Sequence, residues 1–134
     1  GLVGKRALLV TTMAAYPQMM APDGINGLLD VNLWPIQNGI LAFCGFDVLS
    51  PFIVNAAPYL DHDQGQGALR DYAQRLEHLA DDVPMAFHRR DEFDRHWHLR
   101  PEVVPRTVGH AFARRPAAMP GLSNLASNGI HDEP

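Results

Sequence analysis

Two short apolar runs frame the first part of the hydrophobic pattern. The first run, Ala7 to Thr12, is continuous rather than alternating and ends in β-branched polar residues. Such a run predicts a strand buried on both faces, as in a parallel sheet. The second run predicts a strand at roughly 46–49, and the apolar residues beyond Pro51 leave a longer strand as the alternative.

Apolar residues at helical spacing fill the stretch between the two runs. They recur every three or four positions, which predicts an amphipathic helix that buries them in the core. Pro35 interrupts the stretch, so the helix either begins there, with Asn32 as its cap, or is kinked there. Gly39 would permit a close backbone approach, and Gly45 would end the helix. The apolar positions are Leu29, Leu33, Trp34, Ile36, Ile40 and Phe43.

A loop and a second helix complete the pattern. Residues 13–27 are rich in Pro and Gly and include the turn signal Asp23-Gly24. After a polar loop at 55–67, residues 67–81 predict an amphipathic helix, with Arg75 on its solvent face and Asp61 to Asp63 capping it. Its apolar positions are Leu69, Tyr72, Leu76 and Leu79.

The order strand, helix, strand, helix predicts an α/β fold with a parallel sheet. In open sheets of this class, ligands bind at the loops that leave the carboxyl ends of the strands. The loop that follows Thr12 is therefore the candidate binding site.

The remaining residues lose this periodicity. We expect one domain at 1–89 and an extended, loop-rich tail at 90–134. Asp94, His96 and His98 have a spacing compatible with a metal site, but alternating histidines on a charged segment are more often solvated, so we predict no metal. A thin basic cluster is interpreted as solvated rather than phosphate-binding; it consists of Arg106, Arg114 and Arg115.

Composition and charge narrow the function. The 134 residues carry a formal net charge of −4, which disfavours nucleic acid as a partner. No apolar run approaches the roughly 20 residues of a membrane span. The single cysteine, Cys44, fits a reducing compartment, hence the cytoplasm, and we expect it to be a buried small hydrophobe.

One segment is distinctive enough to indicate a family. Residues 24–49, GINGLLDVNLWPIQNGILAFCGFDVL, resemble the NAD(P)H:quinone oxidoreductases of the flavodoxin-like superfamily, the DT-diaphorase type. The similarity runs from Gly4 to about Phe87, and weakly through TVGHAF near residue 107. It covers the carboxyl-terminal half of that family.

The resemblance implies a flavodoxin-like parallel sheet, bound FAD rather than FMN, and a homodimer with the active site at the subunit interface. It also implies hydride transfer from NAD(P)H to the flavin and then two-electron reduction of a quinone. The family's flavin-facing Thr-Thr-Gly-Gly motif reads Thr12, Met13, Ala14 and Ala15 here, followed by Tyr16. Alanine takes positive φ less readily than glycine, which makes the conformation of this loop a point to test.

Further site residues follow from the same resemblance. Met20 and Asn26 occupy the positions of a Tyr and a His that stabilise charge on the reduced flavin. Asn26 can still donate a hydrogen bond, whereas Met20 cannot. Phe43 matches an aromatic that lines the partner subunit's substrate pocket, and Leu69 matches an apolar FAD contact, with Gly65 in place of a cationic neighbour.

The first half of the flavodoxin pattern, with its phosphate-binding loop, has no counterpart here. Two strands alone would leave a sheet edge and an apolar helix face uncovered. Three hypotheses follow. The chain is part of a flavin-dependent quinone reductase, or it is an inactive fragment that acts as a dimerising interaction module without flavin. The third hypothesis is an oxidoreductase subunit completed by another chain.

Overall fold

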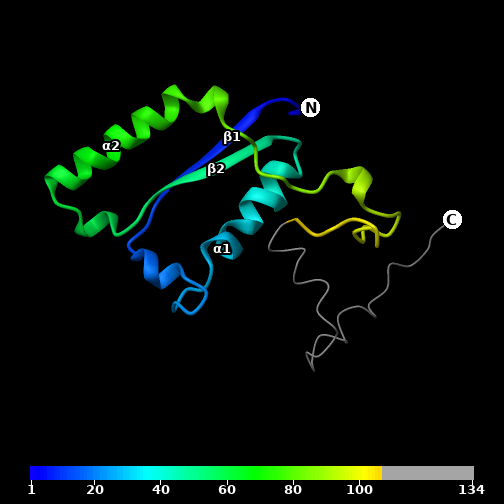
Figure 1. The fold of residues 1–134 in the computed structure, drawn as a ribbon, viewed down its shortest axis with the longest axis horizontal. Coiled ribbons are helices and arrows are strands. Elements are labelled where there is room, and N and C mark those ends of the chain that lie inside the picture. The colour runs from blue at the N-terminus through cyan, green and yellow to red at the C-terminus, as the bar shows by residue number, and fades with distance from the viewer. Residues whose placement is uncertain (107–134) are drawn as a thin grey trace.

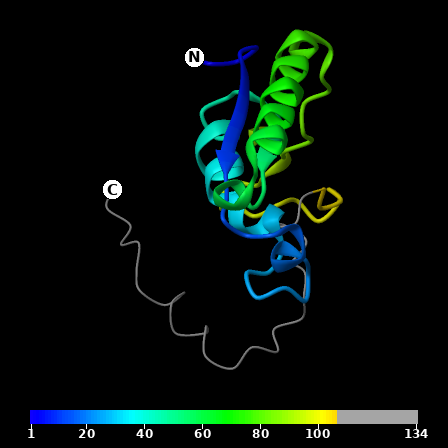
Figure 2. The same cartoon turned by 90° about the vertical axis from the view of Figure 1, so that its left-hand side faces the viewer.

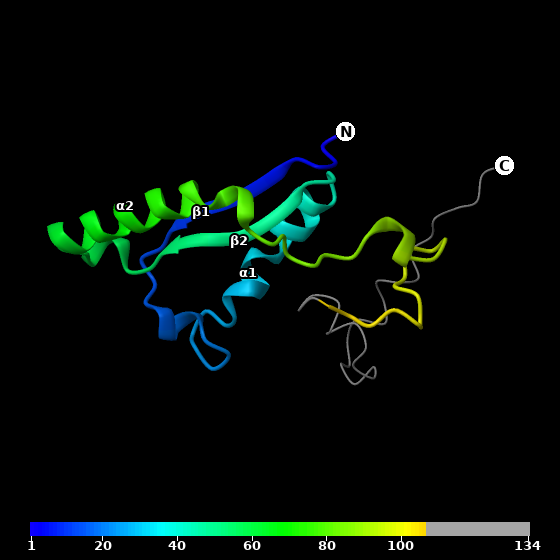
Figure 3. The same ribbon diagram turned by 45° about the horizontal axis from the view of Figure 1, so that its top comes forward.

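The computed structural model describes residues 1–106, which form a parallel two-stranded sheet between two helical layers (Figure 1). Helix α2 covers one face of the sheet, and α1 with its continuation η2 covers the other, as the turned views also show (Figures 2 and 3). The main elements are β1 (Arg6–Thr12), α1 (Leu29–Ile36), the π-helical segment η2 (Gln37–Ala42), β2 (Asp47–Val54) and α2 (His62–Glu77). Short 3-10 helices are η1 (Pro17–Met20), η3 (Ala57–Tyr59), η4 (Leu79–Asp81) and η5 (Arg90–Glu92).

The two strands confirm the predicted α/β order. Leu8 pairs with Leu49 and Val10 with Phe52, so β2 carries an irregularity at Pro51. Proline has no N–H for the ladder and is tolerated at such a bulge, which lets β2 run past it to Val54. The prediction that β1 is buried on both faces is wrong, because Val10 is exposed. Among residues 1–106, β2 is the only strand that pairs with β1, so the other edge of β1 has no neighbour.

The helix between the strands begins earlier than Pro35. Helix α1 starts at Leu29, and Asn32 lies inside it, where its side chain donates to the Leu28 carbonyl at 3.0 Å. The prediction of Asn32 as the cap is therefore wrong. Pro35 lies in the last turn of α1, and the chain continues as a π-helix from Gln37. Because proline lacks an N–H, the regular hydrogen-bond ladder is interrupted at this point.

The face that this helix buries differs from the predicted apolar stripe. Gln37 is only 2% exposed, whereas Ile40 is exposed and Phe43 is 79% exposed. The prediction that Ile36, Ile40 and Phe43 form the core is thus wrong within this chain. Leu33, Val48 and Leu49 make the buried centre instead.

The end of this helix follows the prediction, while its other small residues do not. Gly45 takes φ +96°, and its N–H donates to the Ala42 carbonyl at 2.9 Å, so it terminates the helix. A side chain at Gly39 would meet no atom within 4 Å, so no close approach occurs there within the chain. Cys44 is exposed rather than buried.

Helix α2 begins five residues earlier than the pattern predicts. Asp61 accepts the Gln64 N–H at 2.8 Å and Gln64 accepts the Asp61 N–H at 3.0 Å, which is a capping box. This cap confirms Asp61 in its predicted role. His62 and Asp63 lie in the first turn, so residues 62–67 of the predicted loop are helix.

The predicted apolar stripe of α2 is confirmed at Tyr72, which faces the sheet, and is wrong at Leu69 and Leu76. Tyr72 packs on Phe52 with ring centroids 5.1 Å apart. Leu69 is 62% exposed and Leu76 is also exposed. Arg75 lies on the sheet side rather than in solvent, donating to the Ser50 carbonyl at 3.0 Å and pairing with Asp82. Arg6 of β1 donates to the Leu79 and Asp82 carbonyls, which ties the end of α2 to the sheet.

Residues 84–106 begin against the sheet and α1 and then contact one another. The Met85 N–H donates to the Val48 carbonyl at 2.7 Å, and Phe87 contacts Trp34 with ring centroids 5.8 Å apart. Arg106 pairs with Glu92 beside the buried ring of His88. The division of the chain at residue 89 stays a prediction, and Arg114, Arg115 and the whole TVGHAF segment lie outside the described residues.

The histidine-rich segment forms a turn around Asp94. Oδ1 of Asp94 accepts the backbone N–H groups of His96 and His98 at 2.8 and 2.9 Å. These bonds lower the pKa of Asp94, that from His98 most. Within residues 1–106 no group of three metal-ligating side chains occurs. Across the same residues, no helix is both long and apolar enough to span a bilayer.

Candidate functional site

The loops that leave β1 and β2 meet at the carboxyl edge of the sheet and are joined by their backbones. The Met13 N–H donates to the Val54 carbonyl at 2.9 Å. In return, the Ala57 N–H donates to the Met13 carbonyl at 2.9 Å, and the Ala56 N–H donates to the Ala15 carbonyl at 3.0 Å. The loop after β1 is therefore fixed by the loop after β2.

These bonds decide where the remaining amides of the loop point. In a trans peptide the C=O and the next residue's N–H point in opposite directions. Because the carbonyls of Met13 and Ala15 face the second loop, the N–H groups of Ala14 and Tyr16 face away from it. Neither these two amides nor that of Ala15 donates to another described residue. The loop thus presents free donors at the place where a parallel sheet binds ligands.

The two alanines do not strain this loop. Outside glycine, only Ala56 and Trp97 have positive φ among the described residues. Ala14 and Ala15 therefore occupy the place of two glycines without the left-handed conformation that would penalise a Cβ. Thr12 is the last residue of β1 and pairs with Val54, so the loop begins from a fixed strand end.

A second arm, residues 17–27, folds back on itself beside this loop. A Cβ on Gly24 would lie 2.5 Å from the carbonyl oxygens of Gln18 and Met19, so only glycine fits that turn. The Asn26 N–H donates to the Met19 carbonyl at 2.9 Å, and the Asn32 side chain donates to the Asn26 carbonyl at 2.9 Å. These contacts place Met20 and Asn26 on one compact turn, with the Asn26 side chain exposed.

Two predicted site residues lie away from the loop. Phe43 follows η2, and the neighbouring Gly45 packs against Val3, at the amino edge of the sheet. Leu69 lies in the second turn of α2, on a face turned away from the sheet. Within one chain, neither residue joins Ala14, Ala15, Met20 and Asn26 at the carboxyl edge. A role for Phe43 therefore requires a second chain, as the resemblance implies.

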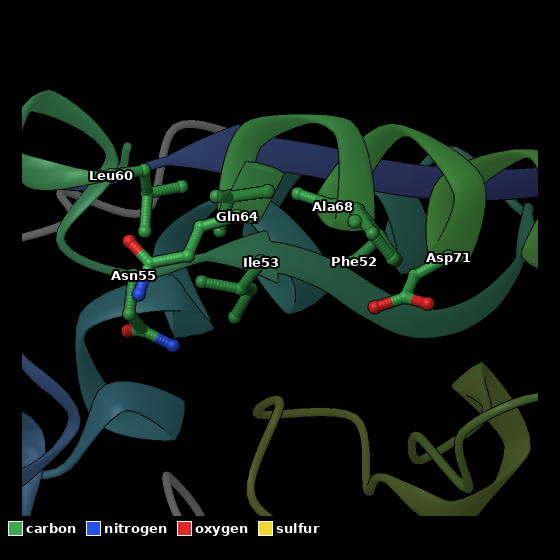
Figure 4. Close-up of a pocket in the computed structure, with 9 residues that line it drawn as sticks. Phe52, Ile53, Asn55, Leu60, Gln64, Ala68 and Asp71 are labelled. Carbon is green, nitrogen blue, oxygen red and sulfur yellow. The ribbon is translucent and has the colours of Figure 1, made fainter. Parts of the chain in front are cut away.

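A shallow groove between β2 and α2 was not predicted (Figure 4). Its volume is about 370 Å³. Asn55 and Gln64 lie at one end and Asp71 at the other, with apolar side chains between them. Gly67 and Ala68 lie in the predicted helix, whereas Gln64 joins the groove only because the helix starts at His62. The remaining lining residues are Phe52, Ile53, Val54 and Leu60.

An aromatic pair also went unpredicted. The rings of Tyr16 and Tyr59 stack with centroids 5.7 Å apart and an interplanar angle of 7°. Tyr59 lies in η3, after β2, so the stack joins the same two loops as the backbone bonds. No periodicity in the sequence marks Tyr59, because it lies between regular elements.

Comparison with known proteins gives consistent results. A family model of the flavodoxin-like fold matches residues 1–78. The chain is similar to NAD(P)H dehydrogenase (quinone) 1 of Rattus norvegicus, with 37% identity over 90 residues, 67% of this chain and 33% of the relative. It is also similar to the human ribosyldihydronicotinamide dehydrogenase (quinone), with 35% identity over 98 residues, 73% of this chain and 40% of the relative.

A solved structure matches over a larger share of the chain. The crystal structure of a proposed quinone reductase from Klebsiella pneumoniae has a TM-score of 0.76 and 35% identity. The match covers 83% of this chain and 44% of that one. The chain therefore spans less than half the length of these relatives.

Proposed function

Because the chain belongs to the family of the flavodoxin-like fold, we propose that it is the carboxyl-terminal part of an NAD(P)H-dependent quinone oxidoreductase that works through a bound flavin. The observation that most supports this proposal is the row of free backbone N–H groups at Ala14 to Tyr16, at the carboxyl edge of a parallel sheet. The relatives named as quinone dehydrogenases supply the substrate class.

The residues of this edge fit the ring end of a flavin. The amides of Ala14, Ala15 and Tyr16 would donate to oxygen and nitrogen atoms of the ring, and Thr12 and Met13 set the start of that row. The exposed Asn26 side chain would donate to charge that develops on the reduced ring or on a quinone oxygen. Met20 would shape an apolar slot. Flavin, when bound, supplies the hydride chemistry between NAD(P)H and the quinone.

The rest of a dinucleotide would need partners beyond these residues. No phosphate-binding helix N-terminus with a glycine-rich loop occurs among residues 1–106. Leu69, exposed on α2, is available for an apolar contact with FAD, the cofactor that we favour over FMN. We propose that the missing part of the flavodoxin fold pairs with the free edge of β1 and supplies the phosphate site.

We further propose a homodimer through the face of α1 and η2. Ile36, Ile40 and Phe43 are exposed there, and large exposed apolar patches mark interaction sites. A partner chain would bring its own Phe43 toward a quinone slot. The composition and the single cysteine favour a cytoplasmic location. The runner-up function is an interaction module without flavin, and the same apolar face favours it.

Cofactor binding tests the proposal directly. The purified 134-residue protein is titrated with FAD and with FMN, and bound flavin is followed by its visible absorbance. NADPH and NADH oxidation is then measured with menadione as acceptor. Flavin binding with menadione-dependent oxidation supports the proposal. A protein that binds neither flavin, alone or after an upstream flavodoxin half is supplied, supports the interaction module instead.

A substitution at Met20 tests whether a hydrogen-bond donor at this position stabilises charge on the reduced flavin. Met20→Tyr places a hydroxyl donor where the resemblance expects one, and we expect turnover of menadione to rise about tenfold. Met19→Tyr is the matched control, because it adds the same ring one residue away. Equal turnover in the Met20 variant and the native protein would mean that this position serves packing only.

A further inference from the structure

We infer that Tyr59 is a positioning residue: through its stack on Tyr16, it holds the 13–16 loop in the conformation that presents its free amides. The importance of this role for a cofactor rests on the proposed function. Tyr59 lies after β2 rather than in the loop that it positions, so the inference adds a second loop to the site.

Tyr59 is the more firmly held member of the pair. Its N–H donates to the Ala56 carbonyl at 2.8 Å, which closes the 3-10 turn η3. Two residues later, Asp61 begins the capping box of α2. Tyr59 is thus fixed between the end of β2 and the start of a sixteen-residue helix. A ring on such a rigid segment can orient a ring on a loop.

The stack is not ordinary core packing. Tyr16 is 44% exposed and Tyr59 is 64% exposed, so neither ring is buried to fill a hydrophobic interior. Near-parallel aromatic rings in offset contact attract each other through dispersion and their quadrupoles. The contact therefore fixes orientation, at a place where the remaining links between the loops are backbone hydrogen bonds.

The orientation that it fixes is that of one peptide group. The peptide between Ala15 and Tyr16 has its carbonyl bound to the Ala56 N–H and its own N–H directed away. Rotation of that peptide would break the bond to Ala56 and turn the Tyr16 N–H away from a ligand. Because the Tyr16 ring is stacked on Tyr59, such a rotation would also separate the rings.

Variants that remove or keep the Tyr59 ring distinguish a role of the stack from a role of the hydroxyl. Tyr59→Ala and Tyr59→Leu remove the stack, whereas Tyr59→Phe keeps the ring and loses only the hydroxyl. Val83→Ala is the control, since Val83 is 85% exposed and lies beyond α2. Amide hydrogen exchange of Ala56 and Ala57 is followed by NMR in each protein, together with urea unfolding.

We expect exchange of the Ala56 and Ala57 amides to accelerate about three- to tenfold in Tyr59→Ala and Tyr59→Leu, in proportion to the lost stacking energy. Tyr59→Phe and Val83→Ala should exchange as the native protein does. Unchanged exchange in both ring-removing variants would overturn the inference. Acceleration in Tyr59→Phe as large as in Tyr59→Ala would also overturn it, because the hydroxyl and not the stack would then be responsible.

FAD titration of the same proteins separates the inference from the proposed function. Flavin affinity should fall about three- to tenfold in Tyr59→Ala, with a shifted visible spectrum, and recover in Tyr59→Phe. If the exchange pattern is as expected but the native protein binds no flavin, the positioning role stands and the flavin function fails. If flavin binds equally to every variant, the positioning role fails and the flavin function stands.

Discussion

Ala56 shows how a single residue sets the geometry of the candidate site. It adopts φ +50°, a left-handed conformation that costs an L-residue about 1–2 kcal/mol. That conformation directs the Ala56 N–H to the Ala15 carbonyl. The neighbouring contacts of Met13 with Val54 and Ala57 stabilise the same arrangement. Strain at the loop that holds the amides of Ala14 to Tyr16 in place fits a functional site.

Residue-level signals predicted part of the local structure. Three such features could be predicted, because each depends on contacts within a few residues: the cap at Asp61, the helix end at Gly45 and the turn at Asp23-Gly24. The stacking of Tyr59 could not be predicted, since its partner, Tyr16, lies 43 residues away in the sequence. The exposure of Cys44 also depends on the course of η2 and not on its neighbours in sequence.

Glu92 gives a prediction for pH. The backbone N–H of Arg89 lowers the pKa of Glu92 below its ordinary value of 4.5, and Arg106 and His88 add to the effect. A carboxylate with a lowered folded pKa stabilises the fold above its unfolded pKa, and this stabilisation is lost as the pH falls through the folded value. We expect the Arg89 amide, which donates to Glu92, to exchange faster below about pH 4.5, measured against the intrinsic rate.

The matched variants for this prediction are Glu92→Gln and Glu102→Gln. Glu92→Gln should remove most of the acid dependence, whereas Glu102→Gln, an exposed residue of the same segment, should keep it. Identical acid profiles for all three proteins would contradict the role of Glu92.

Among the elements, the α1–η2 helix departs furthest from the predicted pattern. A period of 3.6 residues places Ile36, Ile40 and Phe43 on the buried face. The buried face instead carries Leu33 and, one turn later, Gln37, whose amide lies 3.7 Å from the sulfur of Met85. A pattern of apolar residues can predict that a helix exists there. It cannot predict which face is buried when the buried face carries a polar residue such as Gln37.

The attachment of α2 to the sheet gives a second prediction. Arg75→Met keeps an unbranched stem but loses the ion pair with Asp82 and the bond to the Ser50 carbonyl. These side chains are partly buried, so we expect the free energy of unfolding to fall by about 1–2 kcal/mol. Urea unfolding measures the change. Arg70→Met, on the exposed side of the same helix, should stay within about 0.5 kcal/mol of the native protein.

For the whole molecule, the order of strands and helices was predictable and the distribution of burial was not. Continuous apolar runs indicated parallel strands, and the structure has them. Core assignment failed because it assumed that one chain buries its own apolar faces. Val10, Ile40, Phe43 and Leu69 are all exposed in the single chain. Among residues 1–106, no other element covers these side chains.

Self-association tests one of those faces. Phe43→Asp places a charge on the α1–η2 face, and because Phe43 is exposed we expect little change in the fold of one chain. The dimer should weaken by about 2 kcal/mol or more, measured by sedimentation equilibrium. Val83→Asp is the control at another exposed apolar position. A native protein that remains monomeric at high concentration would refute a dimer through this face.

The parallel pairing of β1 and β2 also bears on how the chain folds. Arg6 pairs with Asp47, so the sheet forms only after the whole crossover helix has been made and folded back. Closing so long a loop is slow compared with forming a hairpin. Meanwhile both edges of β1 lie open to other chains. Refolding yield should therefore depend on protein concentration, and newly made chains would gain from chaperones that cover a single unpaired strand.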